Sequence, residues 1–181
     1  MIPPSVPRLR VIVTGALFAM LLSLTACTST ADPAPTPTAT PFFASKKEAF
    51  AAAEETYRAY RDAANATVLS DTKTFEPVYA WLRSDALRAS RKSLTNYHAE
   101  GVTRVGDSTF DTFTPVSYDG ASITVRLCFD VSKVDVVDAA GVSIVAPDRP
   151  ARQPLEVEFR RAETTTGLAV YSSVATQRLS C

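Results

Sequence analysis

The chain has 181 residues, of which 46% are hydrophobic and 21% charged, so it is long enough to bury a real core. Its 19 Lys and Arg residues balance 19 Asp and Glu residues, and it contains a single His. Because the chain has no excess of basic residues, nucleic acid is excluded as a predicted partner.

Residues 1–26 are predicted to be a signal peptide. Arg8 and Arg10 precede an uncharged, apolar run from Val11 to Leu24, the order found in secretory signals. As a helix this run would be roughly 21 Å long, whereas the hydrocarbon core of a bilayer is roughly 30 Å thick. The run is therefore too short for a permanent transmembrane helix.

The next four residues, Leu24-Thr25-Ala26-Cys27, resemble the lipobox of bacterial lipoproteins. In that family the Cys sulfur receives a diacylglycerol and the chain is cut before it, which implies that Cys27 is lipidated and is the first mature residue. Two or more acyl chains hold a protein stably at a membrane, and the diacylglycerol together with palmitate would supply them. The predicted location is the extracytoplasmic face of the cell membrane; an ordinary signal peptide with a coincidental Cys is the alternative.

Residues 27–44 are predicted to be the lipidated Cys followed by a Pro- and Thr-rich tether, with prolines at 33, 35, 37 and 41. Such a segment favours polyproline II and reaches up to roughly 50 Å at about 3.1 Å per residue. Without residues 1–26 the chain has 17 cations and 19 anions, a net charge of −2. No polybasic patch adds an electrostatic membrane contact to the lipid.

Residues 45–181 are predicted to be a single domain that begins with helices. Ser45 and Glu48 form a capping box, with the Glu48 carboxylate expected to accept from the Ser45 amide, and a helix is predicted from 46 to 66. Its inward stripe is Phe50, Ala53, Tyr57, Tyr60 and Ala64, and its outer face carries the pairs Glu54 with Arg58 and Arg58 with Asp62.

A second helical block is predicted from Thr74, with an interruption at 83–85 and an end at Gly101. His98 lies in its last turn, where a cation would complement the helix dipole.

From Val102 the hydrophobic period changes to two, which predicts strands. Asp119-Gly120 predicts a hairpin between strands around 104–118 and 121–131, and a shift in phase predicts a bulge near Ser132-Lys133. A turn at 138–141 leads to Val142–Val145, and the last strands are expected at Leu155–Phe159 and from Gly167 through Tyr171. Successive hairpins predict an antiparallel sheet.

Helices followed by a curved antiparallel sheet predict an α+β fold, a cone-shaped two-layer domain. This order resembles the nuclear transport factor 2 superfamily, the SnoaL-like or cystatin-like cone. The runs Cys128–Ser132, Val134–Asp138 and Ala146–Pro150, followed by Cys181, resemble small actinobacterial lipoproteins that carry such a domain. In the last strand Tyr171 replaces the Trp usual in those proteins. The resemblance implies a fold and a location at the cell envelope, but it implies no enzymatic reaction.

If Cys27 is lipidated, Cys128 and Cys181 remain, and two cysteines in an exported chain predict a disulfide. Free thiols and metal ligation are the alternatives, although two cysteines and one distant His make a poor zinc set. No metal and no cofactor are predicted.

The sequence contains no HExxH, GxSxG or phosphate-loop motif. Enzymes of the superfamily use Asp, His or Tyr inside the cone as acid and base, which makes Tyr57, Tyr60, His98 and Asp130 the candidate pocket residues. The favoured function is a non-enzymatic binding or assembly module of the cell envelope, which engages an envelope protein or a small apolar ligand. The alternative is a small isomerase- or hydrolase-like enzyme. A deep cavity with a carboxylate at its base would favour the enzyme, and a filled cone with an exposed apolar patch would favour binding.

Overall fold

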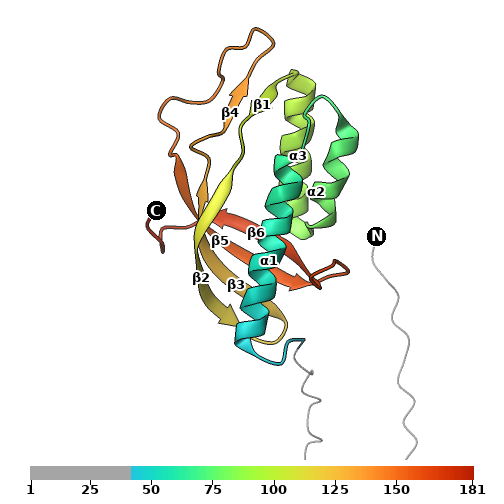
Figure 1. Ribbon diagram of the computed structural model, residues 1–181, viewed down its shortest axis with the longest axis vertical. Helices are drawn as coiled ribbons and strands as arrows, with labels where there is room; N and C mark the ends of the chain where they lie inside the picture. Colours follow the sequence, from blue (N-terminus) through green and yellow to red (C-terminus); the bar gives the residue numbers. More distant parts are fainter. Residues whose placement is uncertain (1–41) are drawn as a thin grey trace, which may run out of the picture. The chain divides into compact units, whose positions relative to one another are not determined.

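A computed structural model describes residues 42–181 (Figure 1). The predictions for the signal peptide, for Cys27 and for most of the tether lie outside these residues. The described part is α+β, with helices that precede an antiparallel sheet, which confirms the predicted fold class. None of the helices in this part is both long and apolar enough to span a bilayer.

Helix α1 (Lys46–Asn65) begins where the capping residues predict. The Ser45 hydroxyl accepts a hydrogen bond from the Glu48 amide at 3.1 Å. The Glu48 carboxylate accepts from the Ala44 amide at 3.1 Å, one residue earlier than predicted. Both contacts satisfy amide groups that have no partner inside the helix.

The two faces of α1 largely follow the predicted pattern. Its buried residues are Ala49, Ala53, Thr56 and Tyr57, while the other predicted inward residues, Phe50, Tyr60 and Ala64, are half-buried against the core. On the outer face the predicted Glu54–Arg58 ion pair is present at 2.9 Å. The Arg58–Asp62 pair is not among the ion pairs of residues 42–181.

The second helical block is divided as predicted. A short 3₁₀ turn (Thr72–Phe75) and α2 (Glu76–Ala80) precede α3 (Ser84–Glu100), and Gly101 ends α3 in a left-handed conformation with φ 65°. The break at Arg83 has a structural cause, because the Arg83 amide donates to the Val170 carbonyl at 2.9 Å and the Val170 amide donates to the Trp81 carbonyl at 3.0 Å. The connection between α2 and α3 is thus bonded to the sheet.

The main sheet has four antiparallel strands in the order β2-β3-β5-β6. These strands are β2 (Thr109–Tyr118), β3 (Ser122–Asp130), β5 (Arg152–Arg161) and β6 (Leu168–Ala175). The Asp119-Gly120 hairpin is confirmed, and the Asp119 carboxylate holds it by accepting from the amides of Ala121 and Ser122 at 2.8 and 2.7 Å. The last strand extends four residues beyond the predicted Tyr171.

A separate two-stranded sheet, β1 (Thr103–Val105) with β4 (Asp135–Val137), extends beyond one end of the main sheet (Figure 1). The prediction of one continuous strand over 104–118 was therefore wrong. The strand is interrupted at Gly106, where φ is 77° and a Cβ atom would lie 1.9 Å from the Lys133 carbonyl oxygen.

The prediction of a bulge near Ser132-Lys133 is also wrong. A turn closed by the Val134 amide on the Val131 carbonyl at 3.0 Å redirects the chain into β4. The turn at 138–141 is confirmed by a 3.0 Å bond from the Gly141 amide to the Asp138 carbonyl. Residues 142–145 form only an isolated bridge, Ser143 with Val137, and no strand.

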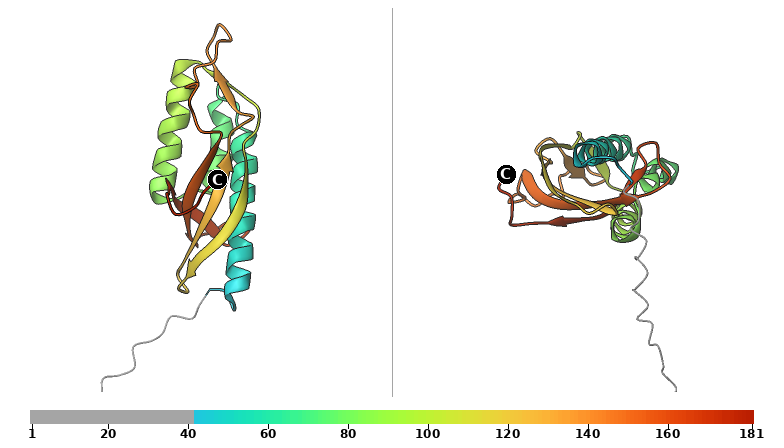
Figure 2. Two further views of the ribbon diagram at one scale, coloured as in Figure 1. Left: turned by 90° about the vertical axis from the view of Figure 1, so that its left-hand side faces the viewer. Right: turned by 90° about the horizontal axis from the view of Figure 1, so that it is seen from below.

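Helix α1 lies along one face of the curved sheet and contacts β2, β3 and β6, whereas α3 contacts β6 (Figure 2). The core between these layers is apolar, and its fully buried side chains include Tyr57, Leu82, Val125, Leu127, Val157 and Phe159. Each such side chain stabilises the fold by about 1.5–3 kcal/mol relative to exposure.

The residues just before α1 are fastened to the sheet. The Phe43 amide donates to the Tyr118 hydroxyl at 3.0 Å, and the two rings meet edge to face with centroids 6.2 Å apart. Phe42 packs over Gly167, where a Cβ atom would lie 2.7 Å from the Phe42 ring. We call Phe42, Phe43, Tyr118 and Gly167 the aromatic clamp.

Candidate functional site

Of the four residues predicted to line a pocket, only Tyr57 and Tyr60 are in contact with each other. Tyr57 belongs to the core, with 1% of its surface exposed and edge-to-face contacts to Tyr60, Phe110 and Phe159. Burial raises the pKa of Tyr57 well above its usual value, and the repulsion from Tyr60 adds to this, although the nearby Arg61 opposes it. Tyr57 is therefore a neutral packing residue.

His98 and Asp130 have local roles. A ring nitrogen of His98, Nδ1, lies 2.8 Å from the Leu69 carbonyl oxygen, and the ring meets Phe75 edge to face. His98 thus ties the end of α3 to the segment after α1. The Asp130 carboxylate accepts hydrogen bonds from Ser132, whose amide lies 2.8 Å away, and these bonds lower the Asp130 pKa. Neither side chain lines a cavity.

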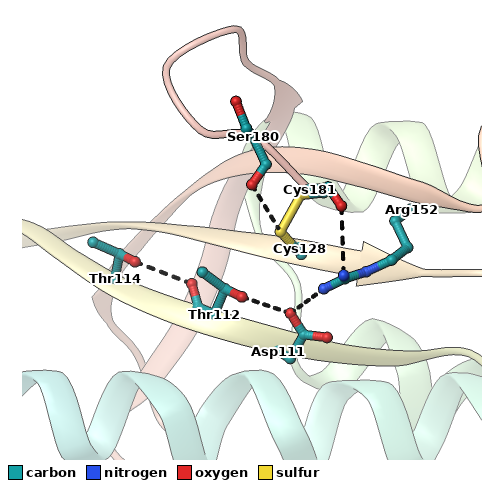
Figure 3. Close-up of a disulfide and its surroundings, with 7 residues drawn as sticks. All are labelled: Asp111, Thr112, Thr114, Cys128, Arg152, Ser180 and Cys181. Carbon is teal, nitrogen blue, oxygen red and sulfur yellow. Dashed lines mark hydrogen bonds and ion pairs between the residues drawn. A yellow bond between two sulfur atoms is a disulfide. The ribbon is translucent and has the colours of Figure 1, made fainter.

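The predicted disulfide is present, joining Cys128 on β3 to Cys181 with a Cα–Cα distance of 5.7 Å (Figure 3). Beside it, Arg152 donates to the Cys181 carbonyl at 3.4 Å and forms an ion pair with Asp111 on β2. The bridge thus fastens the end of the chain to the sheet.

A cavity of about 440 Å³ opens between α1, α3 and the strands. Of the four predicted pocket residues only Tyr60 lines it. Most of its wall is apolar, formed by residues that include Leu82, Leu94, Phe129, Val131, Val136 and Val170. The cone is therefore hollow, and its lining is suited to an apolar molecule.

All the charged residues of this lining are arginines, namely Arg61, Arg104 and Arg149, and no Asp, Glu or His is among them. None of the three takes part in an ion pair within residues 42–181. We call them the cavity arginines. They give the lining, which is otherwise uncharged, a positive charge.

Arg61 reaches the cavity from α1. Its Nη2 donates to the Ser108 hydroxyl at 2.5 Å, and that hydroxyl donates to the Asn65 side chain at 2.9 Å. The guanidinium carbon lies 4.7 Å from the centre of the Phe129 ring and 5.0 Å from that of Tyr60. These two rings, with Ser108, hold the cation in place.

Arg104 and Arg149 bind carbonyl groups. Arg104 donates to the backbone carbonyls of Asn65 and Thr67, at the carboxyl end of α1, where a cation complements the helix dipole. Burial lowers the pKa of Arg104 and the repulsion from Arg61 lowers it further, although Asp107 opposes both. Arg149 donates to the carbonyls of Val131 at 3.0 Å and Val134 at 2.6 Å, which fixes the turn before β4.

The sequence reasoning missed Arg61 and Arg104 as site residues and placed Arg149 only in a structural motif. One signal was available for Arg61, which follows Tyr57 by four residues and so shares the inward face of the helix. A cation inside an apolar stripe is unusual and indicates a special environment.

The lining offers few groups for general acid–base chemistry. General acid–base chemistry needs a titratable side chain within hydrogen-bonding reach of the reacting atom, and the cavity offers only the Tyr60 and Tyr97 hydroxyls and three cations. Within residues 42–181 no three His, Cys, Asp or Glu side chains are grouped so as to hold a metal ion.

No protein-family model and no curated protein matches the chain. Among solved structures it is similar to a proposed aromatic ring hydroxylase of Novosphingobium aromaticivorans, with a TM-score of 0.48 and 15% identity over 73% of this chain and 96% of that one. It is also similar to the intermembrane space region of chloroplast protein ARC6, with a TM-score of 0.48 and 13% identity over 68% and 92% of the two chains. Agrobacterium tumefaciens VirB8 gives a TM-score of 0.41 and 8% identity over 76% and 97%. Because these names point to different functions, the function of this chain must be argued from the cavity.

Proposed function

We propose that the chain is a lipid-anchored, extracytoplasmic binding module that holds a small, largely apolar ligand in its cavity without transforming it. The observation that carries this proposal is a cavity of about 440 Å³ whose lining is mostly apolar and contains no carboxylate or imidazole. Its volume lies in the range of roughly 300–1,000 Å³ that small-molecule sites occupy. The filled cone expected of a binding module is not found, but the carboxylate expected at the base of an enzyme's cavity is missing from the lining.

The location is supported by two features. The Cys128–Cys181 disulfide is of a kind that persists outside the reducing cytoplasm. The Leu24–Cys27 stretch supports a lipid anchor at Cys27, with the membrane as the partner of the anchor. In this arrangement the tether would hold the cavity close to the membrane, where sparingly soluble ligands concentrate.

The proposal is tested by filling the cavity. Ser90 lies on α3, is half-buried and lines the cavity, so Ser90→Phe should occupy it. Thr95→Phe is the matched control, since Thr95 lies on the same helix, is exposed and does not line the cavity. The full protein, isolated from its own cell envelope and returned to phosphatidylcholine vesicles, is titrated with radiolabelled decanol, and protein-free vesicles give the background.

We expect saturable binding by the native protein and by Thr95→Phe, and a loss of about tenfold or more in Ser90→Phe, because the ring excludes the ligand. Absence of saturable binding by the native protein would contradict the proposal. Recovery of a natural ligand that the protein converts chemically would contradict its non-enzymatic part.

A further inference from the structure

Arg61 is the cavity arginine with the fewest hydrogen-bond partners. A guanidinium has five N–H donors, and within residues 42–181 Arg61 has a single hydrogen-bond partner, the neutral Ser108 hydroxyl. Its Nε is buried and has no partner. No carboxylate of the described residues lies within ion-pair distance of it, so the charge is not neutralised.

The other cavity arginines have more hydrogen bonds, although the Arg104 Nε is likewise buried without a partner. Arg104 makes four hydrogen bonds with the end of α1 and with Gly106, and Arg149 makes two with the turn before β4. These contacts explain why each of the two is present. The fold offers no comparable account of Arg61, because a hydroxyl such as Ser108 needs no cation to satisfy it.

A half-buried cation without a counterion is unfavourable, and its neighbours make it more so. Removing charge from water costs free energy unless an opposite charge is supplied, and Arg61 is also repelled by Arg104. The Phe129 and Tyr60 rings nevertheless hold the Arg61 guanidinium in one place. An acidic group brought in by a ligand would supply the missing charge and accept hydrogen bonds from the free donors.

We infer that the cavity binds a small amphiphile with one acidic headgroup, a carboxylate or a phosphate monoester, which is held by Arg61 while the apolar body lies along the wall that includes Leu82 and Val170. This inference rests on the proposed function and names the class of ligand. Ser108 acts as a positioning residue, since it fixes one edge of the Arg61 guanidinium. The apolar wall gives affinity for the body of the ligand, and Arg61 gives selectivity for its charge.

The test compares ligands that differ only in the headgroup. The vesicle-bound full protein is titrated at neutral pH with decanoate, decyl phosphate and decanol, with inorganic phosphate as a competitor. At least one of the two anions should bind about tenfold or more tightly than decanol, because hydrogen bonds to ionised groups are stronger than those between neutral ones. The tighter anion identifies the headgroup.

Equal affinity for decanol and both anions would overturn the inference and leave the proposed function standing, whereas no binding of any of the three would overturn both. Inorganic phosphate that competes as strongly as decyl phosphate would show an anion site without an amphiphile, and would also overturn the inference.

Substitution then assigns the selectivity to one side chain. Arg61→Gln should abolish the preference for the anion, so that the anion binds no more tightly than decanol. Arg58→Gln is the matched control, since Arg58 lies one turn earlier on α1, pairs with Glu54 and is absent from the cavity lining. Retention of the full preference in Arg61→Gln would overturn the role of Arg61, as would an equal loss in Arg58→Gln. Because the headgroup comparison uses the native protein, the inference remains testable even if Arg61→Gln does not fold.

Discussion

Removal of the disulfide should cost the domain a large part of its stability. The bond joins residues 53 positions apart, and the chain-entropy relation gives about 4 kcal/mol for closing a loop of that length in the unfolded chain. Ala is the better replacement in a double Cys128→Ala, Cys181→Ala variant, because Cys128 is 1% exposed and a Ser hydroxyl there would be buried. We expect the melting temperature to fall by about 10–15 °C in a domain of this size.

Urea unfolding followed by circular dichroism measures the effect. The denaturant dependence should become steeper in the variant, because an unfolded chain without the bridge exposes more surface. The native protein unfolded in reducing buffer is the control and should match the variant. A variant within about 1 kcal/mol of the oxidised native protein would refute the loop-closure argument.

Three further predictions concern the anchor, the tether and the core. Cys27→Ala should abolish incorporation of labelled palmitate and leave the precursor uncut at this position; label that still enters the variant would exclude Cys27. Deletion of residues 29–40 would shorten the predicted tether by about 37 Å and should impair the native phenotype strongly. His98→Ala should impair it less, because it removes only the bond to Leu69, which contributes about 1 kcal/mol to stability. If both variants fold and His98→Ala does more harm than the deletion, the result would favour the enzyme. Because burial raises the pKa of Tyr57 above its usual 10.0, the unfolded chain loses the phenolic proton first, so the free energy of unfolding should fall above about pH 10. Tyr57→Phe should flatten this decline, and an unchanged pH profile would assign it to other groups.

Local sequence signals predicted the elements whose cause is local. Ser45 begins α1, Gly101 ends α3 and Asp119-Gly120 makes the hairpin, and each works through contacts within a few residues along the chain. The disulfide followed from the number of cysteines, once Cys27 was assigned to the lipid anchor of an exported chain. These features need no knowledge of the rest of the molecule.

The small β1–β4 sheet could not be predicted in the same way. Its strands have the same alternation as the strands next to them, so the period of two continues through the break. What separates β1 from β2 is the contact of Gly106 with the Lys133 backbone, two residues that lie far apart in the sequence.

The cavity arginines were missed for a related reason. Arg61, Arg104 and Arg149 come from α1, β1 and the loop before β5, and only the folded chain brings them into one cavity lining. The predicted pocket residues were chosen by the chemistry expected of an enzyme, which directed attention to His98 and Asp130. Both proved to be local hydrogen-bonding groups.

The aromatic clamp also determines how the domain bears mechanical load. A pull transmitted along the preceding chain would reach the aromatic clamp before α1, and through Phe43 it would reach the Tyr118 hydroxyl at the end of β2. The same pull reaches the turn before β6 through the contact of Phe42 with Gly167. Force is therefore shared between two edges of the sheet before it acts on the first turn of α1. If the chain is tethered as proposed, this arrangement would take up load before it reaches the helix that carries Arg61.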